Sequence, residues 1–199
     1  AMANTKQVKG ADVFNNGFST APAYVGGDGV AFFSASHPTV SGGIQSNVAA
    51  ASDLSEAALE TIITNIQKIK DDRNILIGSS AVSLHIPPDL WSTADQILHS
   101  PGSTVAGGTG DGTYAQNNIN AIRHMGMIPE GFFVNRRFTD TNNYYIKTDV
   151  PNGAKMFVRV PLQTKMEPDF DTGNLRFKAR ERYSFGFSDW RSYFGSQGS

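Results

Sequence analysis

The chain has 199 residues and a formal net charge of −1, with no cysteine and with 39% hydrophobic and 11% aromatic residues. Zinc-thiolate sites and disulfide scaffolds are therefore excluded, and the aromatic content argues against low-complexity disorder. Because the charge is nearly neutral, contact with nucleic acid or an anionic membrane has to be local. No apolar run approaches the roughly 20 residues that span a bilayer, so the sequence predicts a soluble protein. The helical and strand patterns described below make α+β its expected fold class.

The N-terminal region of the chain begins with Ala1-Met2, which indicates a cloning remnant followed by a shortened natural segment. Residues 13–35 then carry the cluster Gly26-Gly27-Asp28-Gly29 between the β-prone runs Tyr24-Val25 and Val30 to Phe33. Glycine tolerates positive φ, so this pattern predicts a long hairpin.

The strongest helical signal follows a connecting loop. Asp53 and Glu56 are spaced as an N-cap residue and a carboxylate three positions on. Apolar residues then recur at helical spacing, namely Leu54, Ala58, Leu59, Ile62, Ile63, Ile66 and Ile69. The pattern predicts a helix from about 54 to 72.

The rest of the chain is dominated by β-type patterns. Residues 81–86 alternate apolar and polar side chains before Pro87-Pro88, which predicts a half-buried strand. A short helix over residues 90–98 and a flexible glycine-rich loop over 100–113 are expected next. Residues 119–125 fit a strand or one helical turn equally well, and the later strands are expected at 131–138, 144–148, 155–160, 174–180 and 183–187.

Charge is distributed unevenly along the chain. Residues 1–154 hold 9 lysines and arginines against 13 aspartates and glutamates, whereas residues 155–199 hold 8 against 5. A negative front and a positive back can attract a second copy head to tail. A solvated basic strand face accounts for the same count.

The four histidines, His37, His85, His99 and His124, lie in no nucleophile elbow, zinc-binding helix or ligand pair. No catalytic residue, cofactor or metal ligand is therefore assigned. A small hydrolase that uses His37 or His124 with a nearby Asp stays open as an alternative.

Glu167, Asp169 and Asp171 form a carboxylate cluster whose alternate oxygens could hold Ca²⁺. The spacing is incomplete for a calcium loop, because Gly173 stands where a further ligand is needed. A solvated hairpin tip, or an acidic patch that faces a basic neighbour, is favoured over a calcium-stabilised decoration module.

Residues 174–180 alternate basic and apolar side chains. Period two places Arg176, Lys178 and Arg180 on an outer face, where they can form ion pairs across an interface. Leu175, Phe177 and Ala179 are expected to face a core, which makes the aromatic ring unavailable for stacking on bases. The closing aromatics are expected to pack in the core as well, namely Tyr183, Phe185, Phe187, Trp190 and Tyr193.

Several motifs, taken in their order and spacing, resemble the major head subunit of Mu-type tailed bacteriophages and related prophages over residues 24–195. They are Asp28 to Phe33 with His37-Pro38, Asp53 to Leu59, Asp149 to Gly153, Phe170 to Phe177, and Arg182 to Arg191. The resemblance implies the Hong Kong 97-like (Johnson) capsid fold, in which an extended hairpin arm, a long spine helix and a sheet accompany an axial domain.

On this resemblance the chain divides into five segments. They are the remnant and shortened N-terminal segment at 1–12, the extended arm at 13–35, the first segment of the peripheral domain at 36–80 with the spine helix at 54–72, the axial domain at 81–150, and the second segment of the peripheral domain at 151–199. Residues 13–35 contain no lysine, so the lysine cross-link of some relatives is not carried over.

The implied function is that of a self-assembling structural subunit, which forms capsomers and an icosahedral shell around packaged DNA. Its partners would be copies of itself, scaffolding and other head proteins, and double-stranded DNA bound without sequence specificity, with no membrane. It would be found in the virion and, during assembly, in the host cytoplasm. The candidate assembly contacts are Tyr24, Val25, Gly26, Gly27, Asp28, Gly29, Glu167, Asp169, Asp171, Arg176, Lys178 and Arg180.

Overall fold

The computed structural model describes residues 2–102, 119–168, 171 and 173–199. Its helices are α1 (Met2–Asn15), α2 (Glu56–Gln67), α3 (Trp91–His99) and α4 (Ala121–His124), with short 3₁₀ turns η1 (Pro88–Leu90) and η2 (Trp190–Ser192). Its strands are β1 (His37–Pro38), β2 (Ile44–Gln45), β3 (Ala81–Ile86), β4 (Phe132–Val134), β5 (Tyr144–Thr148), β6 (Ala154–Pro168), β7 (Leu175–Phe187) and β8 (Tyr193–Ser196). No helix among these residues is long and apolar enough to cross a membrane.

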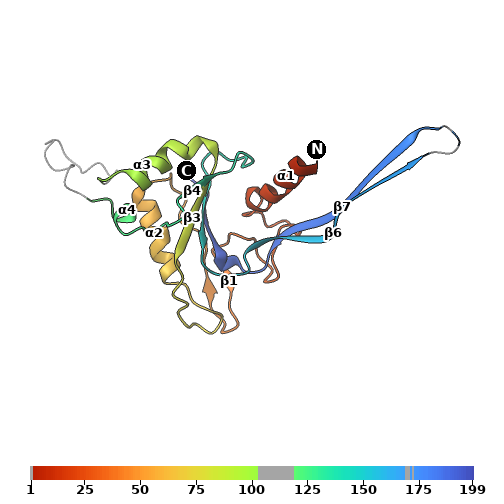
Figure 1. Cartoon of the computed structure of the whole chain (residues 1–199). Coiled ribbons are helices and arrows are strands. Elements are labelled where there is room, and N and C mark those ends of the chain that lie inside the picture. Colours follow the sequence, from red (N-terminus) through yellow and green to blue (C-terminus); the bar gives the residue numbers. More distant parts are fainter. Residues whose placement is uncertain (1, 103–118, 169–170, 172) are drawn as a thin grey trace.

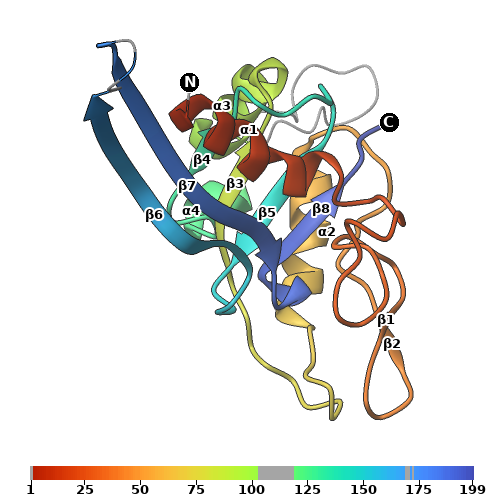
Figure 2. The same cartoon turned by 90° about the vertical axis from the view of Figure 1, so that its right-hand side faces the viewer.

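The body is built on a four-stranded sheet in the order β4-β3-β5-β8. β3 pairs parallel with β4 and antiparallel with β5, which pairs antiparallel with β8. α2 and α3 lie on one side of this sheet and α1 on the other (Figures 1 and 2). The apolar stripe of α2 and the strand residues Leu84, Ile86 and Ile146 form one buried cluster.

α2 begins and ends inside the expected range of 54–72. Its N-cap is Ser55, whose hydroxyl accepts a hydrogen bond from the amide of Ala58 at 3.2 Å, so the expected cap at Asp53 is wrong. The helix ends at Gln67 because the chain then turns back, with the Asp71 carboxylate accepting bonds from the amides of Arg73 and Ile75.

The other elements agree with the sequence patterns to different degrees. β3 and β5 have the expected bounds, and residues 121–124 form the helical turn of α4. The two strands expected at 174–180 and 183–187 are one continuous strand, β7. Most of the loop expected at 100–113 lies outside the described residues.

Residues 13–35 do not form an extended hairpin, and this expectation is wrong. α1 occupies the segment up to Asn15, and the only strand-like pairing described there is the bridge between Val25 and Ala31. Phe32 and Phe33 are 0% and 2% exposed. Burying these two aromatic rings contributes more free energy than leaving them exposed on an extended arm, so the segment folds back onto the body.

A different segment leaves the body. β6 and β7 form a two-stranded antiparallel ribbon that projects away from the sheet (Figure 1). We call this element the ribbon.

Candidate functional site

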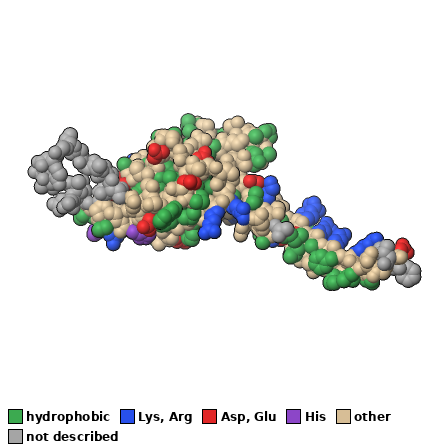
Figure 3. Space-filling model, turned by 90° about the horizontal axis from the view of Figure 1, so that it is seen from above, with side chains coloured by type: hydrophobic (Ala, Val, Ile, Leu, Met, Phe, Trp, Pro, Cys, Tyr) green, Lys and Arg blue, Asp and Glu red, His purple; other side chains and the backbone are tan. Residues whose placement is uncertain are grey.

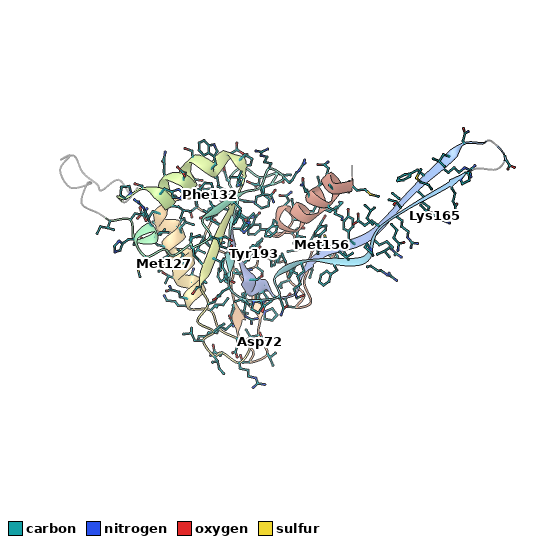
Figure 4. All side chains as sticks on the ribbon, in the orientation of Figure 1. Asp72, Met127, Phe132, Met156, Lys165 and Tyr193 are labelled. Atoms are coloured by element: carbon teal, nitrogen blue, oxygen red, sulfur yellow. The ribbon has the colours of Figure 1, made fainter. Side chains whose placement is uncertain are left out.

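The ribbon is long, and its two strands pair along it except in one irregular stretch. Its register runs from Ala154 opposite Phe187 to Pro168 opposite Leu175. At a rise of roughly 3.3 Å per residue, β6 extends about 50 Å. Figure 4 shows Met156 beside α1 and Lys165 toward the far end. The register shifts between Val158 and Gln163, where Pro161 supplies no amide hydrogen for the ladder.

The base of the ribbon is fixed to the body. The Phe187 ring stacks on buried Phe32 with centroids 4.2 Å apart. α1 lies over the next section of β7, where a Cβ at Gly10 would meet the Phe185 ring at 3.4 Å, and Lys6 pairs with Glu181. The base is therefore held in place while the outer section of the ribbon stands clear of the body.

Successive side chains of a strand point to opposite sides, so the outer section of the ribbon has two faces of different composition. The first, which we call the apolar face, carries Thr164, Met166, Pro168, Leu175, Phe177 and Ala179. Met166, Leu175 and Phe177 are 58%, 62% and 64% exposed. The expected alternation of residues 174–180 is confirmed, but the expectation that Leu175, Phe177 and Ala179 face a core is wrong, because nothing in the described portion of the chain covers them.

The opposite face, which we call the cationic face, carries Lys165, Arg176, Lys178, Arg180 and Arg182 with a single carboxylate, Glu167. Figure 3 shows basic side chains along one edge of the ribbon and hydrophobic side chains along the other. Lys165 stands directly opposite Lys178 in the register. Two like charges directly opposite each other repel, so a negatively charged group bound between Lys165 and Lys178 would stabilise the two strands at this point.

The acidic cluster expected at the ribbon end is only partly described. Glu167 contacts Lys165 and lies opposite Arg176, and Asp171 is exposed, whereas Asp169 lies outside the described residues. Across residues 2–102, 119–168, 171 and 173–199 no group of three His, Cys, Asp or Glu side chains is placed to hold a metal ion.

Three of the six candidate contacts at residues 24–29, namely Val25, Gly26 and Asp28, are engaged inside the molecule. Val25 is bridged to Ala31, and Gly26 packs so closely that a Cβ there would lie 2.8 Å from the Phe187 ring. Gly29 has φ 83°, which closes the turn. Tyr24, 37% exposed, faces outward, as do Gly27 and Gly29, which have no atom within 4 Å of their Cβ positions. This segment is therefore a turn of the body and not the tip of an arm.

Asp28 is held by a buried histidine. His37 is 0% exposed, with Nδ1 2.6 Å from Asp28 Oδ2 and Nε2 3.1 Å from Asn47 Oδ1, and its ring stacks on Trp190 at 4.1 Å. The Asn47 amide donates to the carbonyls of Phe32, Trp190 and Tyr193. These bonds connect the N-terminal turn with the C-terminal segment and satisfy groups that would be costly to bury alone.

The hydrolase alternative needs a histidine that contacts both a hydroxyl and a carboxylate. His37 contacts Asp28 and Asn47, His85 contacts the Ser83 hydroxyl at 3.2 Å, and His99 contacts Asp95 at 2.8 Å. None of the four described histidines contacts both groups, so no nucleophile and base are brought together.

A groove of about 1150 Å³ lies between α1, β4 and the base of the ribbon. It is lined by aromatic and cationic side chains, among them Phe14, Phe133 and Arg136, and by His85. Burial, with a smaller contribution from the Lys147 charge, lowers the pKa of His85 to about 4, while Glu130 opposes this shift. His85 is therefore neutral at pH 7.

The free energy of unfolding is expected to fall as the pH is lowered from about 6.5 to about 4. In this pH window His85 is protonated in the unfolded chain and neutral in the folded chain. The loss of folding stability therefore levels off below the folded pKa of about 4. The size is about 3 kcal/mol at most, because the ring is only partly buried. Urea denaturation over this range measures it. His85→Leu should flatten the profile, whereas exposed His124→Leu should leave it unchanged, and an equal slope in all three proteins would contradict the assignment.

Comparison with known proteins gives a match to a family model and matches to solved structures. A family model described as phage capsid protein matches residues 1–194. Among solved structures, the chain is similar to one titled as the capsid of an empty GTA particle computed with C5 symmetry, with 15% sequence identity and a TM-score of 0.45. The alignment covers 100% of this chain and 65% of that one, so this chain spans about two thirds of its length. No curated protein matches.

Proposed function

Because the chain belongs to the phage capsid protein family, we propose that it is a structural subunit whose copies associate into capsomers and close an icosahedral shell around packaged DNA. The observation that carries this proposal is the apolar face of the ribbon. It is held away from the body by a fixed base, and Leu175 and Phe177 are more than half exposed.

The apolar face is the surface that a neighbouring copy would cover. Fully burying a side chain such as Leu, Met or Phe contributes roughly 1.5–3 kcal/mol each. Three such residues, repeated in every subunit, supply a gain that assembly would realise. The ribbon thus takes the role that the sequence assigned to residues 13–35.

We further propose the narrower assignment to the Hong Kong 97-like fold and to head subunits of the Mu type, on the motifs between Asp28 and Arg191. The boundary expected at 80/81 passes through a single core, because α2 and β3 share one buried cluster. We therefore propose that α2 belongs to the axial unit together with the sheet and α3, and that the outer section of the ribbon belongs to the peripheral unit.

The subunit is proposed to act without catalysis, in the virion and, during assembly, in the host cytoplasm. The dispersed contacts of the four histidines support this view, since none joins a hydroxyl to a carboxylate. Scaffolding and other head proteins are its proposed partners besides its own copies.

Size-exclusion chromatography and negative-stain imaging of the purified protein test this proposal. We expect capsomer rings or closed particles whose population grows with protein concentration, because each contact joins two copies. Compact monomers at every concentration and salt condition would contradict the proposal.

A further inference from the structure

The cationic face contains a regular row of four basic residues. Arg176, Lys178, Arg180 and Arg182 occupy successive alternate positions of β7, so their Cα atoms are about 6.6–7 Å apart. Lys165 of β6, which pairs with Glu167, lies opposite Lys178. A hollow of about 430 Å³ is lined by Gln163, Thr164, Lys165, Lys178 and Arg180.

Most of this row has no negative partner within the molecule. Among the residues that the structure describes, no carboxylate lies within ion-pair distance of Lys178, Arg180 or Arg182. α1 contacts β7 through Glu181, Tyr183 and Phe185, which alternation places on the opposite face. The cationic face is therefore open to a partner between Lys178 and Arg182.

We propose that the cationic face of the ribbon binds the phosphate backbone of double-stranded DNA. Several evenly spaced cations on a two-stranded ribbon can follow successive phosphates, and such ribbons are known to fit the major groove of DNA, which is about 12 Å wide. Contact through phosphates does not depend on the base sequence, as is needed for a shell whose inner surface contacts DNA of any sequence. This inference rests on the proposed function in one respect, namely that a phage head encloses DNA.

The test compares two triple variants with equal charge changes. One removes ribbon charges, through Lys178→Gln, Arg180→Gln and Arg182→Gln, and the other removes exposed body charges, through Lys68→Gln, Arg73→Gln and Arg123→Gln. Binding to a labelled duplex of about 20 base pairs is followed by fluorescence anisotropy from about 50 to 200 mM salt. We expect the ribbon variant to lose affinity about tenfold or more at the lowest salt, and the slope of log K against log salt to shrink by about 3. The body variant should bind as the unmodified protein does.

Three results would overturn the inference. They are no binding by the unmodified protein at the lowest salt, an equal loss in both variants, and a ribbon variant that binds the duplex normally but fails to form particles. The third result would assign the row to a contact with a second copy. Particles formed by a ribbon variant that no longer binds DNA would support the inference and, separately, the proposed function.

Discussion

Replacing Phe32 with alanine is expected to lower the free energy of unfolding by about 3–5 kcal/mol, the usual cost of deleting a large buried aromatic side chain. Phe32 is 0% exposed, stacks on Phe187 at 4.2 Å, and lies 4.6 Å from the Phe33 ring. The cavity would open where the N-terminal turn, the base of the ribbon and the C-terminal segment meet. Urea denaturation measures the effect.

The same chain offers a matched control on the ribbon. Phe177 is 64% exposed, so Phe177→Ala removes an equal volume where no core surrounds it. Its effect on the free energy of unfolding should stay within about 0.5 kcal/mol. Equal effects at the two positions would show that residues 24–33 leave the body, as the sequence alone predicted.

Deleting residues 159–182 and joining Val158 to Tyr183 through an Asn-Gly turn is expected to abolish particle formation while the body stays folded. Val158 and Tyr183 are paired in the register, and Asn-Gly favours the two-residue turn that closes such a hairpin. The deletion removes both exposed faces of the ribbon and the ion pair between Lys6 and Glu181, and it leaves the contacts of Phe185 with α1 and of Phe187 with Phe32. Circular dichroism and negative-stain imaging measure the two consequences.

Substitutions on one face at a time distinguish the role of the apolar face from that of the cationic face. Leu175→Ser with Phe177→Ser should prevent assembly, because it removes the apolar contact and retains the backbone ladder. The triple variant of Lys178, Arg180 and Arg182 on the other face of the same strand should still assemble. Normal particles from the double serine variant would place the subunit contact elsewhere.

How much could be predicted from the sequence depended on whether the signal was local. The periodicity of α2 and the alternation of β3 and β5 depend on neighbouring residues, and the structure confirms these elements. Alternation in residues 174–180 also gave the two faces of β7. Period two says which side chains share a face, however, and not whether another region of the molecule covers it.

The course of residues 13–35 could not be read in this way. The glycine cluster does form a turn, closed by the bond from the Gly26 amide to the Val30 carbonyl at 2.8 Å. What decides the course of the segment is the pairing of Phe32 with Phe187, which is distant in the sequence. No local sequence pattern reveals a contact between residues so far apart, so a turn that packs on the body was predicted to be an extended arm.

The candidate site was found only partially. Arg176, Lys178 and Arg180 were identified as an outer face, and the same alternation extends to Arg182, which was missed. Residues 24–29 were assigned to an interface, but Asp28 is engaged by His37. Asn47, with bonds to three backbone carbonyls, gave no signal, since its neighbours form an irregular, polar loop.

A cryo-electron microscopy map of assembled particles tests most directly whether the ribbon joins the subunits. We expect Leu175 and Phe177 to lie against a neighbouring copy, while residues 24–29 stay packed on their own body. A map in which these two side chains face solvent, with neighbouring copies meeting instead through Tyr24 and Gly27, would contradict this expectation.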